Sequence, residues 1–410
     1  MKNNRTFLEK LLDGAEVEWR TLGEVSELRN TGVDKKINES EKSVRLLNFT
    51  DVFNNQYLSN STPTMIVTAS DKKIIDCNIL KGDLFITPTS EILDEIGQSA
   101  VALENIDNAV YSYHIMRIRI HDTNFLLPEF LNYLFRTSQI KQQIRKNAQG
   151  ITRFGLTLPR WKSLVIPIPP LSVQTEIVKI LDALTALTSE LTSELTLRRK
   201  QYEYYREKLL SEEELIKLGA TAENLGDVTS ISSGGTPSTK EPTYWVGGNI
   251  PWIKSESCKN KLIDEIKHHI TEVGLQNSNA KLLSPNTTLM AMVGATIFKT
   301  AFLPFEATTN QNIAAIKSKN ELSITDKFIF YYLTNMYDFF ISKLSGYNMV
   351  NLSQIKNIKI LLPPLEEQQR IVAILDKFEA LTNSITEGLP LAIEQSQKRY
   401  EYYRELLLSF

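Results

Sequence analysis

Two long segments of the chain place apolar side chains at alternating steps of four and three residues. The first series breaks at Arg198 and otherwise runs through Ile177, Leu181, Leu184, Thr188, Leu191, Leu195, Tyr202, Tyr205 and Leu209. This heptad spacing is typical of a helix that packs along its length against a second helix. A Pro-Pro pair, Pro169–Pro170, stands just before the series and suits the entry to a helix.

The second series runs through Ile371, Leu375, Phe378, Thr382, Ile385, Leu389, Ile393, Tyr400, Tyr403 and Leu407. It holds four more residues than the first, which makes a stutter in the heptad pattern. Gly388 and Pro390 fall inside the stutter, so we expect a kink or a short break there.

These helices are copies of one another. Residues 166–188 match 360–382, and QYEYYREKLL at 201–210 matches RYEYYRELLL at 399–408. A match of this length indicates an internal duplication. The first copy also carries a TSEL tandem at 188–195, and each four-residue unit lengthens a helix by about 6 Å. The tandem therefore allows the length of this helix to change by whole four-residue units.

The N-terminus continues this pattern. FLEKLL at 7–12 resembles the last turns of both helix copies, at 205–210 and 403–408. We expect two units related by a pseudo-twofold axis, with the cut between the chain ends placed inside one helix.

Between the helices lie two segments in which short β-type runs alternate with turns. Each then carries one helix-like stretch near its end, at 127–148 and 324–344, and the clearest strand runs are at 43–52, 83–90 and 111–120. The expected class is α+β, with two similar domains that each hold a twisted, irregular sheet. The predicted organisation is a first domain at 1–165 with a helix remnant at 1–14, a central helix at 166–218, a second domain at 219–360 and a C-terminal helix at 361–410.

Composition adds few constraints. The 410 residues are 42% hydrophobic and 23% charged, as expected of a soluble globular protein. No apolar run approaches the roughly 18–20 residues that span a bilayer, and the N-terminus lacks the apolar core of a signal peptide. We therefore expect a cytoplasmic protein without a membrane partner.

A net charge of −2 is unfavourable for a nucleic-acid binder, but the charge is unevenly distributed. Segments 130–175 and 339–365 contain no acidic residue, and the first of them holds seven basic ones. Either run alone fits a solvated helix face. Their matched placement before each long helix favours a surface that faces a ligand.

Catalytic motifs are missing. The segment 294–300 lacks the second glycine of a nucleotide-binding loop, and the Pro-Pro pairs do not belong to the Asn/Asp-Pro-Pro-aromatic tetrapeptide of a base-modifying site. Cys77 and Cys258 lie far apart, so we expect packed, reduced thiols and no zinc site. The four histidines, His114, His121, His268 and His269, are expected on the surface.

Three loops carry groups suited to nucleic acid. Residues 234–240, GGTPSTK, place small donors and a lysine around a Gly-Gly turn that could approach a phosphate closely. Residues 309–312 and 149–153 offer amide and guanidinium groups that can pair with base edges. Each of the three could equally be an ordinary surface turn. Tyr244 and Trp245 are expected to belong to the core.

The whole chain resembles the specificity subunits of type I restriction–modification systems. The resemblance rests on residues 81–101, 233–257 and 294–316 and on the two helix starts that follow the pattern PPLxxQxxI. It implies that each variable domain recognises half of a split DNA sequence, and that the two repeated helices pack antiparallel as a spacer.

The resemblance also implies partners. These are double-stranded DNA, two modification subunits that bind S-adenosylmethionine and methylate adenine, and optionally a restriction subunit that uses ATP and Mg. This chain itself is then non-catalytic and holds no cofactor and no metal. The candidate DNA-contacting residues are Lys35, Lys36, Arg45, Thr89, Ser90, Gln149, Thr152, Arg153, Arg160, Gly235, Thr236, Ser238, Thr239, Lys240, Lys254, Asn310, Gln311, Tyr347 and Asn348. The candidate spacer and subunit-docking residues are Ile177, Leu181, Leu184, Leu191, Leu195, Tyr202, Ile371, Leu375, Phe378, Tyr400 and Tyr403.

Two other functions remain open from the residues. One is a methyltransferase or nuclease fused to its own specificity module, which the missing catalytic motifs disfavour. The other is a coiled-coil scaffold that does not bind DNA, which the near-neutral charge allows.

Overall fold

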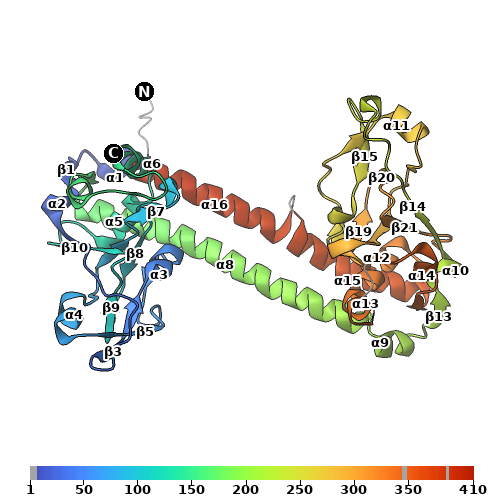
Figure 1. The fold of residues 1–410 in the computed structure, drawn as a ribbon, viewed down its shortest axis with the longest axis horizontal. Coiled ribbons are helices and arrows are strands. Elements are labelled where there is room, and N and C mark those ends of the chain that lie inside the picture. The colour runs from blue at the N-terminus through green and yellow to red at the C-terminus, as the bar shows by residue number, and fades with distance from the viewer. Residues whose placement is uncertain (1–6, 344–348, 385–386) are drawn as a thin grey trace. The chain divides into compact units, whose positions relative to one another are not determined.

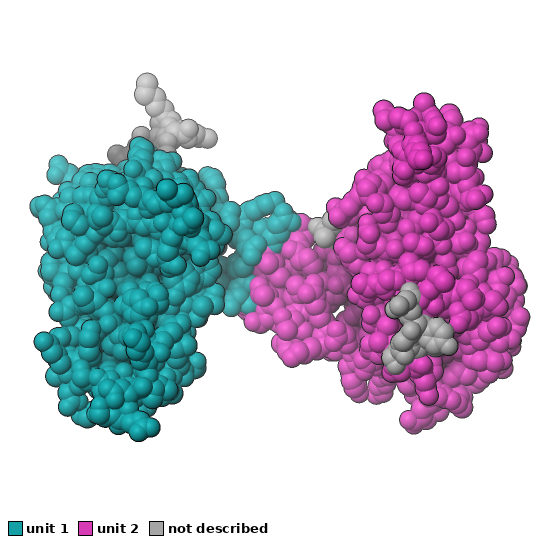
Figure 2. Space-filling view, in the orientation of Figure 1, with its two compact units in different colours: residues 1–189, 394–410 teal, residues 190–393 magenta. Residues whose placement is uncertain are grey.

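A computed structural model describes residues 7–343, 349–384 and 387–410. The chain divides into two compact units, unit 1 with residues 1–189 and 394–410, and unit 2 with residues 190–393 (Figure 2). The predicted boundaries treat the long helices as separate segments, whereas in the structure the helices at Leu171–Leu209 and Gly388–Leu407 each contribute residues to both units and the helix at Leu365–Asn383 belongs to unit 2.

The elements of unit 1 lead into the first long helix. In order they are α1 (Phe7–Leu12), β1 (Glu18–Thr21), α2 (Leu22–Val25), β2 (Ser26–Arg29), β3 (Lys42–Leu47), α3 (Phe49–Asn54), β4 (Tyr57–Leu58), β5 (Met65–Ala69), α4 (Asp71–Asp76), β6 (Leu84–Ile86), β7 (Thr89–Ser90), η1 (Leu93–Glu95), β8 (Ser99–Ala102), β9 (Ala109–Tyr111), β10 (Met116–Ile120), α5 (Pro128–Leu134), α6 (Ser138–Asn147), β11 (Phe154–Gly155), α7 (Leu158–Lys162), β12 (Val165–Ile168) and α8 (Leu171–Leu209) (Figure 1).

Unit 2 continues from the second part of α8. Its elements, with the helices that follow, are α9 (Glu212–Lys217), β13 (Thr221–Asn224), α10 (Leu225–Val228), β14 (Thr229–Ser233), η2 (Pro242–Tyr244), β15 (Ile250–Ile253), η3 (Ser255–Ser257), β16 (Lys261–Leu262), β17 (His269–Ile270), α11 (Glu272–Gln276), β18 (Thr287–Ala291), η4 (Gly294–Thr296), β19 (Thr300–Leu303), β20 (Thr308–Thr309), β21 (Ile313–Ser318), α12 (Asp326–Asn335), α13 (Tyr337–Lys343), α14 (Leu352–Lys356), β22 (Lys359–Leu362), α15 (Leu365–Asn383) and α16 (Gly388–Leu407).

The two units share one sheet topology, although their sequences differ outside the helices. Each has a five-stranded sheet, ordered β2-β10-β6-β8-β4 in unit 1 and β14-β21-β18-β19-β16 in unit 2. Each also has a three-stranded sheet, β5-β3-β9 or β17-β15-β20, and a two-stranded pair, β1-β12 or β13-β22. The last strand of each five-stranded sheet runs parallel to its neighbour. The α+β class is confirmed, and the duplication extends to these three sheets of each unit; unit 1 also has the two-stranded pair β7-β11.

Apolar faces explain the packing. In unit 1 the buried face of the five-stranded sheet, with Leu84, Ile86 and Ile118, packs on Phe130 and Leu134 of α5. In unit 2 Met290 and Ile316 meet Phe328 and Phe330 of α12 in the same way. Cys77 and Cys258 are both buried and free, as expected of packed thiols.

Capping residues split several predicted elements. The strand run at 43–52 ends as β3 at Leu47, because the Asn48 side chain accepts from the backbone N–H groups of Thr50 and Asp51 and starts α3. The helix-like stretch at 127–148 becomes α5 and α6, since Thr137 caps the second helix. The stretch at 324–344 likewise divides into α12 and α13.

The long helices follow the predicted seam within each unit. In unit 1, Ile177 and Leu181 are fully buried together with Leu407 of α16, and the hydroxyls of Thr188 and Ser396 lie 2.8 Å apart. In unit 2, Tyr202 packs on Phe378 of α15, and Arg199 donates to the Thr382 carbonyl at 3.5 Å. In both pairs the contacts move forward along α8 and backward along the other helix: Thr188 follows Ile177 as Ser396 precedes Leu407, and Tyr202 follows Arg199 as Phe378 precedes Thr382. The helices are therefore antiparallel.

The remaining seam residues are mostly half-buried: Leu184, Leu191, Leu195, Phe378, Tyr400 and Tyr403. Ile371 and Leu375 are fully buried. The predicted break is confirmed, because α15 ends at Asn383 and α16 begins at Gly388, which has a φ of +78°. Ile385 lies outside the described residues.

The predicted equivalence of the N-terminus needs correction. Helix α1 does not match the end of a long helix; its counterpart is α9, a short helix that follows α8 after Leu210 and Ser211. Both short helices are followed by a glycine with positive φ, Gly14 at +86° and Gly219 at +80°, and then by an equivalent strand. Each unit therefore has a short helix before its first strand.

Candidate nucleic-acid interface

In unit 2 the candidate residues gather where two parallel strands end. Strands β15 and β20 pair in parallel, with Ile253 opposite Thr309, so Lys254 and Asn310 leave the sheet at the same edge. The Asn310 N–H donates to the Ile253 carbonyl at 3.0 Å. Asn310 is itself buried, and Gln311 beside it is exposed.

The Gly234–Gly235 turn packs against this edge. A Cβ on Gly234 would lie 2.0 Å from the Thr309 carbonyl oxygen, and one on Gly235 would lie 2.5 Å from the carbonyl carbon of Asn279. The Gly235 N–H donates to the Thr309 carbonyl at 2.9 Å, and the Gly235 carbonyl accepts from Trp252. The turn therefore needs its glycines to fit its own unit, whereas the sequence suggested a close approach to phosphate.

The residues after the turn are exposed. Thr236 donates to the Gln311 side chain at 2.6 Å, which joins the turn to the strand-end residues. Ser238, Thr239 and Lys240 follow on the surface. We call residues 236–240, 254 and 310–311 the loop face of unit 2.

The aromatic residues behind this loop face support it. Trp245 is half-buried rather than fully in the core; its ring meets Trp252 at 5.0 Å and its indole N–H donates to the Ser238 carbonyl at 3.1 Å. Tyr244 is half-buried as well. Lys254 places its ammonium 5.8 Å from the centre of the Trp252 ring.

Unit 1 repeats this arrangement with other side chains. Strands β3 and β9 are parallel, and the Val33 N–H donates to the Tyr111 carbonyl at 2.9 Å, as Gly235 donates to Thr309. Tyr113 and His114 follow β9 where Gln311 follows β20, and their rings lie 4.0 Å apart. Sequence reasoning missed this pair, because only the strand topology shows their equivalence to Gln311.

A tight loop brings Arg153 to the same place. Gln149 and Gly155 exchange two backbone hydrogen bonds of 2.9 Å, which close the loop, and Thr152 and Arg153 are exposed on it. Arg153 donates to Thr89 at 3.1 Å. Thr89, Ser90, His114 and Arg153 line a cavity of about 370 Å³. We call residues 89–90, 113–114 and 151–153, with Lys35, the loop face of unit 1.

Charges on this face affect one histidine. Burial, with the nearby positive charges of Lys35 and Arg153, lowers the pKa of His114 below its ordinary value. His114 therefore takes up a proton less readily than an ordinary histidine. Lys36 pairs with Asp34 at 3.0 Å, and Ser90 donates to Glu95 at 2.7 Å, so both have partners within the unit.

Two candidate arginines of unit 1 have structural roles in the described chain. The Arg45 guanidinium donates to the side chain of Asn60 at 2.5 Å and to the Asp107 carbonyl at 2.6 Å. Arg160 donates to the Asn147 carbonyl at 2.6 Å and reaches the Gln149 amide at 3.1 Å. Both guanidinium groups donate hydrogen bonds within unit 1, whereas Arg153 is exposed on its loop. Tyr347 and Asn348 lie outside the described residues.

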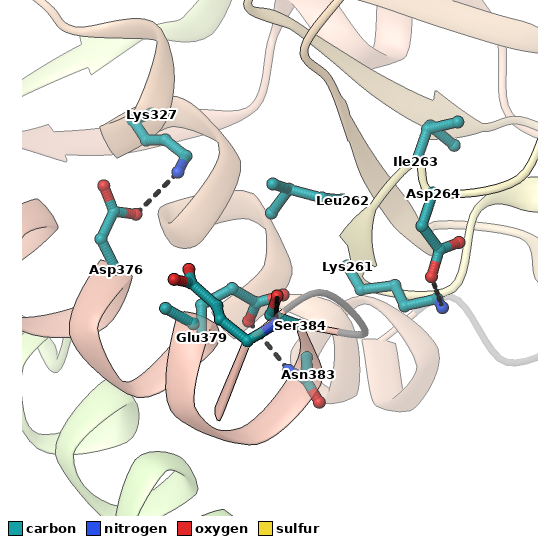
Figure 3. Close-up of a pocket in the computed structure, with 11 residues that line it drawn as sticks. Lys261, Leu262, Ile263, Asp264, Lys327, Asp376, Glu379, Asn383 and Ser384 are labelled. Atoms are coloured by element: carbon teal, nitrogen blue, oxygen red, sulfur yellow. Dashed lines mark hydrogen bonds and ion pairs between the residues drawn. The ribbon is translucent and has the colours of Figure 1, made fainter. Parts of the chain in front are cut away.

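Unit 2 also has a cavity at the end of α15 (Figure 3). It has a volume of about 440 Å³ and lies between Lys261–Asp264, Lys327 of α12 and the end of α15. Asp376 accepts from Lys327 at 2.8 Å and from Tyr331 at 2.5 Å, and burial raises the pKa of Glu379. In unit 1 the residue at the start of the equivalent edge strand is Tyr57, whose hydroxyl donates to Asp182.

Other binding chemistry is limited in the part of the chain that the structure describes. No group of three or more His, Cys, Asp or Glu side chains there could hold a metal ion. None of the described helices is both long and apolar enough to cross a membrane.

The comparisons with known proteins agree with this geometry. A family model described as the type I restriction modification DNA specificity domain matches residues 15–197 and again residues 221–395. The chain belongs to this family. The two matches coincide with the two halves of the duplication, so each half is one copy of the specificity domain.

Relatives extend over the full chain. The specificity subunit of the type I restriction enzyme EcoR124I/EcoR124II of Escherichia coli is 33% identical over 99% of this chain and 97% of its own length. A type I specificity subunit of Haemophilus influenzae is 37% identical over all of both chains. The crystal structure of the type I S subunit from M. genitalium has the same fold, with a TM-score of 0.56, 14% identity and 97% coverage of each chain.

Proposed function

We propose that this chain is the DNA-recognition subunit of a type I restriction–modification complex, in which each unit recognises one half of a two-part sequence. The observation that carries the proposal is the pair of loop faces. One strand framework presents different side chains at the same edge in the two units, as expected if the frame is shared and the recognised bases differ.

The exposed groups suit base and phosphate contacts. Glutamine pairs with adenine through its amide, and arginine pairs with guanine through its guanidinium. Gln311 in unit 2 and Arg153 in unit 1 are exposed and held by a neighbouring hydroxyl, Thr236 or Thr89. Thr152, Ser238, Thr239 and Lys240 surround them with donors for phosphate oxygens.

In this proposal the chemistry belongs to partner subunits. Two modification subunits bind the repeated helices, carry S-adenosylmethionine and methylate adenine, and a restriction subunit that uses ATP and Mg is a further partner. This chain supplies sequence recognition and no catalytic group. The partners also supply positive charge, which the net charge of −2 requires for strong binding to DNA.

Mapping of methylated adenines tests the proposal. The chain is expressed with its modification subunit in a host free of other methyltransferases, and the host genome is sequenced for methyladenine. We expect a split motif with a fixed gap, present only when the chain is present. Methylation that is independent of the chain, or a motif without a gap, would contradict the proposal.

Binding measurements separate this function from a scaffold. The complex is titrated with a duplex that carries the mapped motif and with a scrambled duplex at several salt concentrations. A DNA-recognition subunit gives strong preference for the motif, and the affinity falls steeply with salt. A scaffold gives equal affinity for both duplexes.

A further inference from the structure

The sequence Tyr-Glu-Tyr-Tyr-Arg-Glu occurs unchanged at 202–207 in α8 and at 400–405 in α16. Some helix positions around it have changed between the copies, since Leu197 corresponds to Gln395 and Lys208 to Leu406, while Leu209 and Leu210 recur as Leu407 and Leu408. The first motif belongs to unit 2 and the second to unit 1.

Both copies adopt one arrangement within their own unit. The rings of Tyr204 and Tyr205 lie 5.4 Å apart at 72°, and those of Tyr402 and Tyr403 lie 5.4 Å apart at 75°. Arg206 lies 5.6 Å from the Tyr202 ring centre, and the equivalent arginine and ring of α16 lie 5.5 Å apart.

Internal packing explains only part of this identity. The first tyrosine of each motif packs into its unit; Tyr202, for example, is 7% exposed. The middle tyrosines do not, since Tyr204 is 57% exposed and Tyr402 is 63% exposed. Substitutions at exposed helix positions usually change stability little, so stability does not require the same tyrosine in both copies. A contact that both units make with the same partner does require the same tyrosine in both copies.

Charge defines the surface around these tyrosines. Glu203, Glu207 and Glu401 are exposed, and none of them forms an ion pair within the described ranges. Glu405 differs, because it accepts from the backbone N–H of Ser138 at 3.1 Å. Lys208 places its ammonium 5.8 Å from the centre of the Tyr204 ring, and α16 has Leu406 at that position. Both copies share an exposed aromatic ring beside an exposed glutamate, Glu203 or Glu401. A protein cleft with an apolar floor and a basic group on its rim would complement this shared ring and glutamate.

We propose that Tyr204 and Tyr402 are equivalent anchor residues for two copies of one partner protein, one copy on each unit. The inference rests on the proposed function, in which that partner is the modification subunit. In the complex, the ring of each tyrosine enters a cleft of the partner and becomes buried there. Basic side chains of the partner pair with the neighbouring glutamates.

Native mass spectrometry of the co-expressed complex tests the inference. The full chain is purified with its modification subunit as wild type, Tyr204→Ala, Tyr402→Ala and the double variant. We expect two modification subunits on the wild type, one on each single variant and none on the double variant. Loss of an anchor residue typically weakens the altered site by about 30-fold or more.

Two further variants control the result. Leu197 is 62% exposed on the same helix but is not repeated, so Leu197→Ala is expected to keep two copies. Tyr204→Phe keeps the ring and is expected to bind within about threefold of wild type. Circular dichroism melting checks that every variant is folded.

Three outcomes would overturn the inference: two copies on the double variant, loss of both copies from one single variant, or a chain that self-associates through these tyrosines without the modification subunit. Failure of the proposed function looks different, because then the wild-type chain itself would bind no modification subunit and direct no methylation.

Discussion

Unit 1 and unit 2 attach their long helices through the same hydrogen bonds. Gln174 at the start of α8 donates to the carbonyls of Phe125 and Pro169 and accepts from the Leu127 N–H, at 2.8–2.9 Å. Gln368 at the start of α15 makes the same three bonds in unit 2, at 2.9–3.0 Å. Both side chains are fully buried.

Other internal contacts are duplicated too. A Cβ on Gly23 would lie 2.8 Å from that of Lys162, and a Cβ on Gly226 would lie 2.8 Å from that of Lys356. The loop faces are not duplicated: Tyr113 and His114 stand where unit 2 has Gln311. The contrast indicates that the frame and its attachment to the helices serve a common task, while the loop faces serve different ones.

The first prediction concerns α8, which is continuous where its counterpart is broken. Deleting one TSEL unit from 188–195 shortens α8 by about 6 Å, nearly two base pairs at about 3.4 Å each. We expect methylation at the original motif to be lost and a motif with a shorter gap and unchanged halves to appear. Methyladenine mapping measures this, and Ser189→Ala with Ser193→Ala is the control of unchanged length. An unchanged gap in the deletion variant would disprove the spacer role.

The second prediction tests the shared attachment. Gln174→Leu or Gln368→Leu leaves one N–H and two carbonyls without their buried partner, and each such group costs about 1–3 kcal/mol. We expect each variant to lose roughly 3 kcal/mol or more in its own unit. Hydrogen exchange with mass spectrometry reports the two units separately. The exposed Gln397, changed to Leu, should have no effect, and unequal losses in the two units would break the equivalence.

The third prediction addresses the contrast between the loop faces. Arg153→Ala is expected to relax only the half-site recognised by unit 1, and Gln311→Ala only the other half. A well-placed side chain contributes about 1–3 kcal/mol of base discrimination, or about 5- to 150-fold. Each variant is the control for the other when methylation motifs are mapped. A change in both halves from one substitution would show that the loop faces do not act independently.

The smallest expected effect concerns Glu379, which stands where unit 1 has Thr185. Burial raises the pKa of Glu379 above its ordinary value of 4.5, so the folded state binds its proton more tightly than the unfolded state. The stability from this group is full below about pH 4.5 and is lost as pH rises through the folded-state pKa. We expect Glu379→Gln to be more stable than wild type at pH 7, and the gain to vanish at low pH. Urea unfolding at several pH values measures both, and Thr185→Ala shows whether unit 1 lacks this dependence.

The sequence alone predicted features that depend on local pattern. The heptads, the Pro-Pro helix starts, the break near Gly388 and the α+β class follow from periodicity and backbone preference, which act over short distances. The strand order did not follow, because β3 pairs with β9 across more than sixty residues and such pairing depends on tertiary contacts.

The candidate site was predictable only in part. Gln311, Thr236, Thr89 and Arg153 do gather on loop faces. Arg45 and Arg160 do not, because a sequence does not reveal which cations already have partners inside the fold. The Gly-Gly turn was also predicted only in part. Its glycines do indicate a close contact, but the contacting group is the backbone of the protein itself and not a phosphate.

The hydroxyl contact between Thr188 and Ser396 has a consequence for assembly of the helix pair in unit 1. Apolar seam residues are nearly interchangeable, so a pair built from them alone could form with its helices shifted by one heptad. Such a shift would set the Thr188 hydroxyl against the ring of Tyr403 and leave Ser396 without its partner. A polar pair in the seam therefore selects one alignment at some expense of stability, which matters most for a chain whose two helices are near copies and could each pair wrongly.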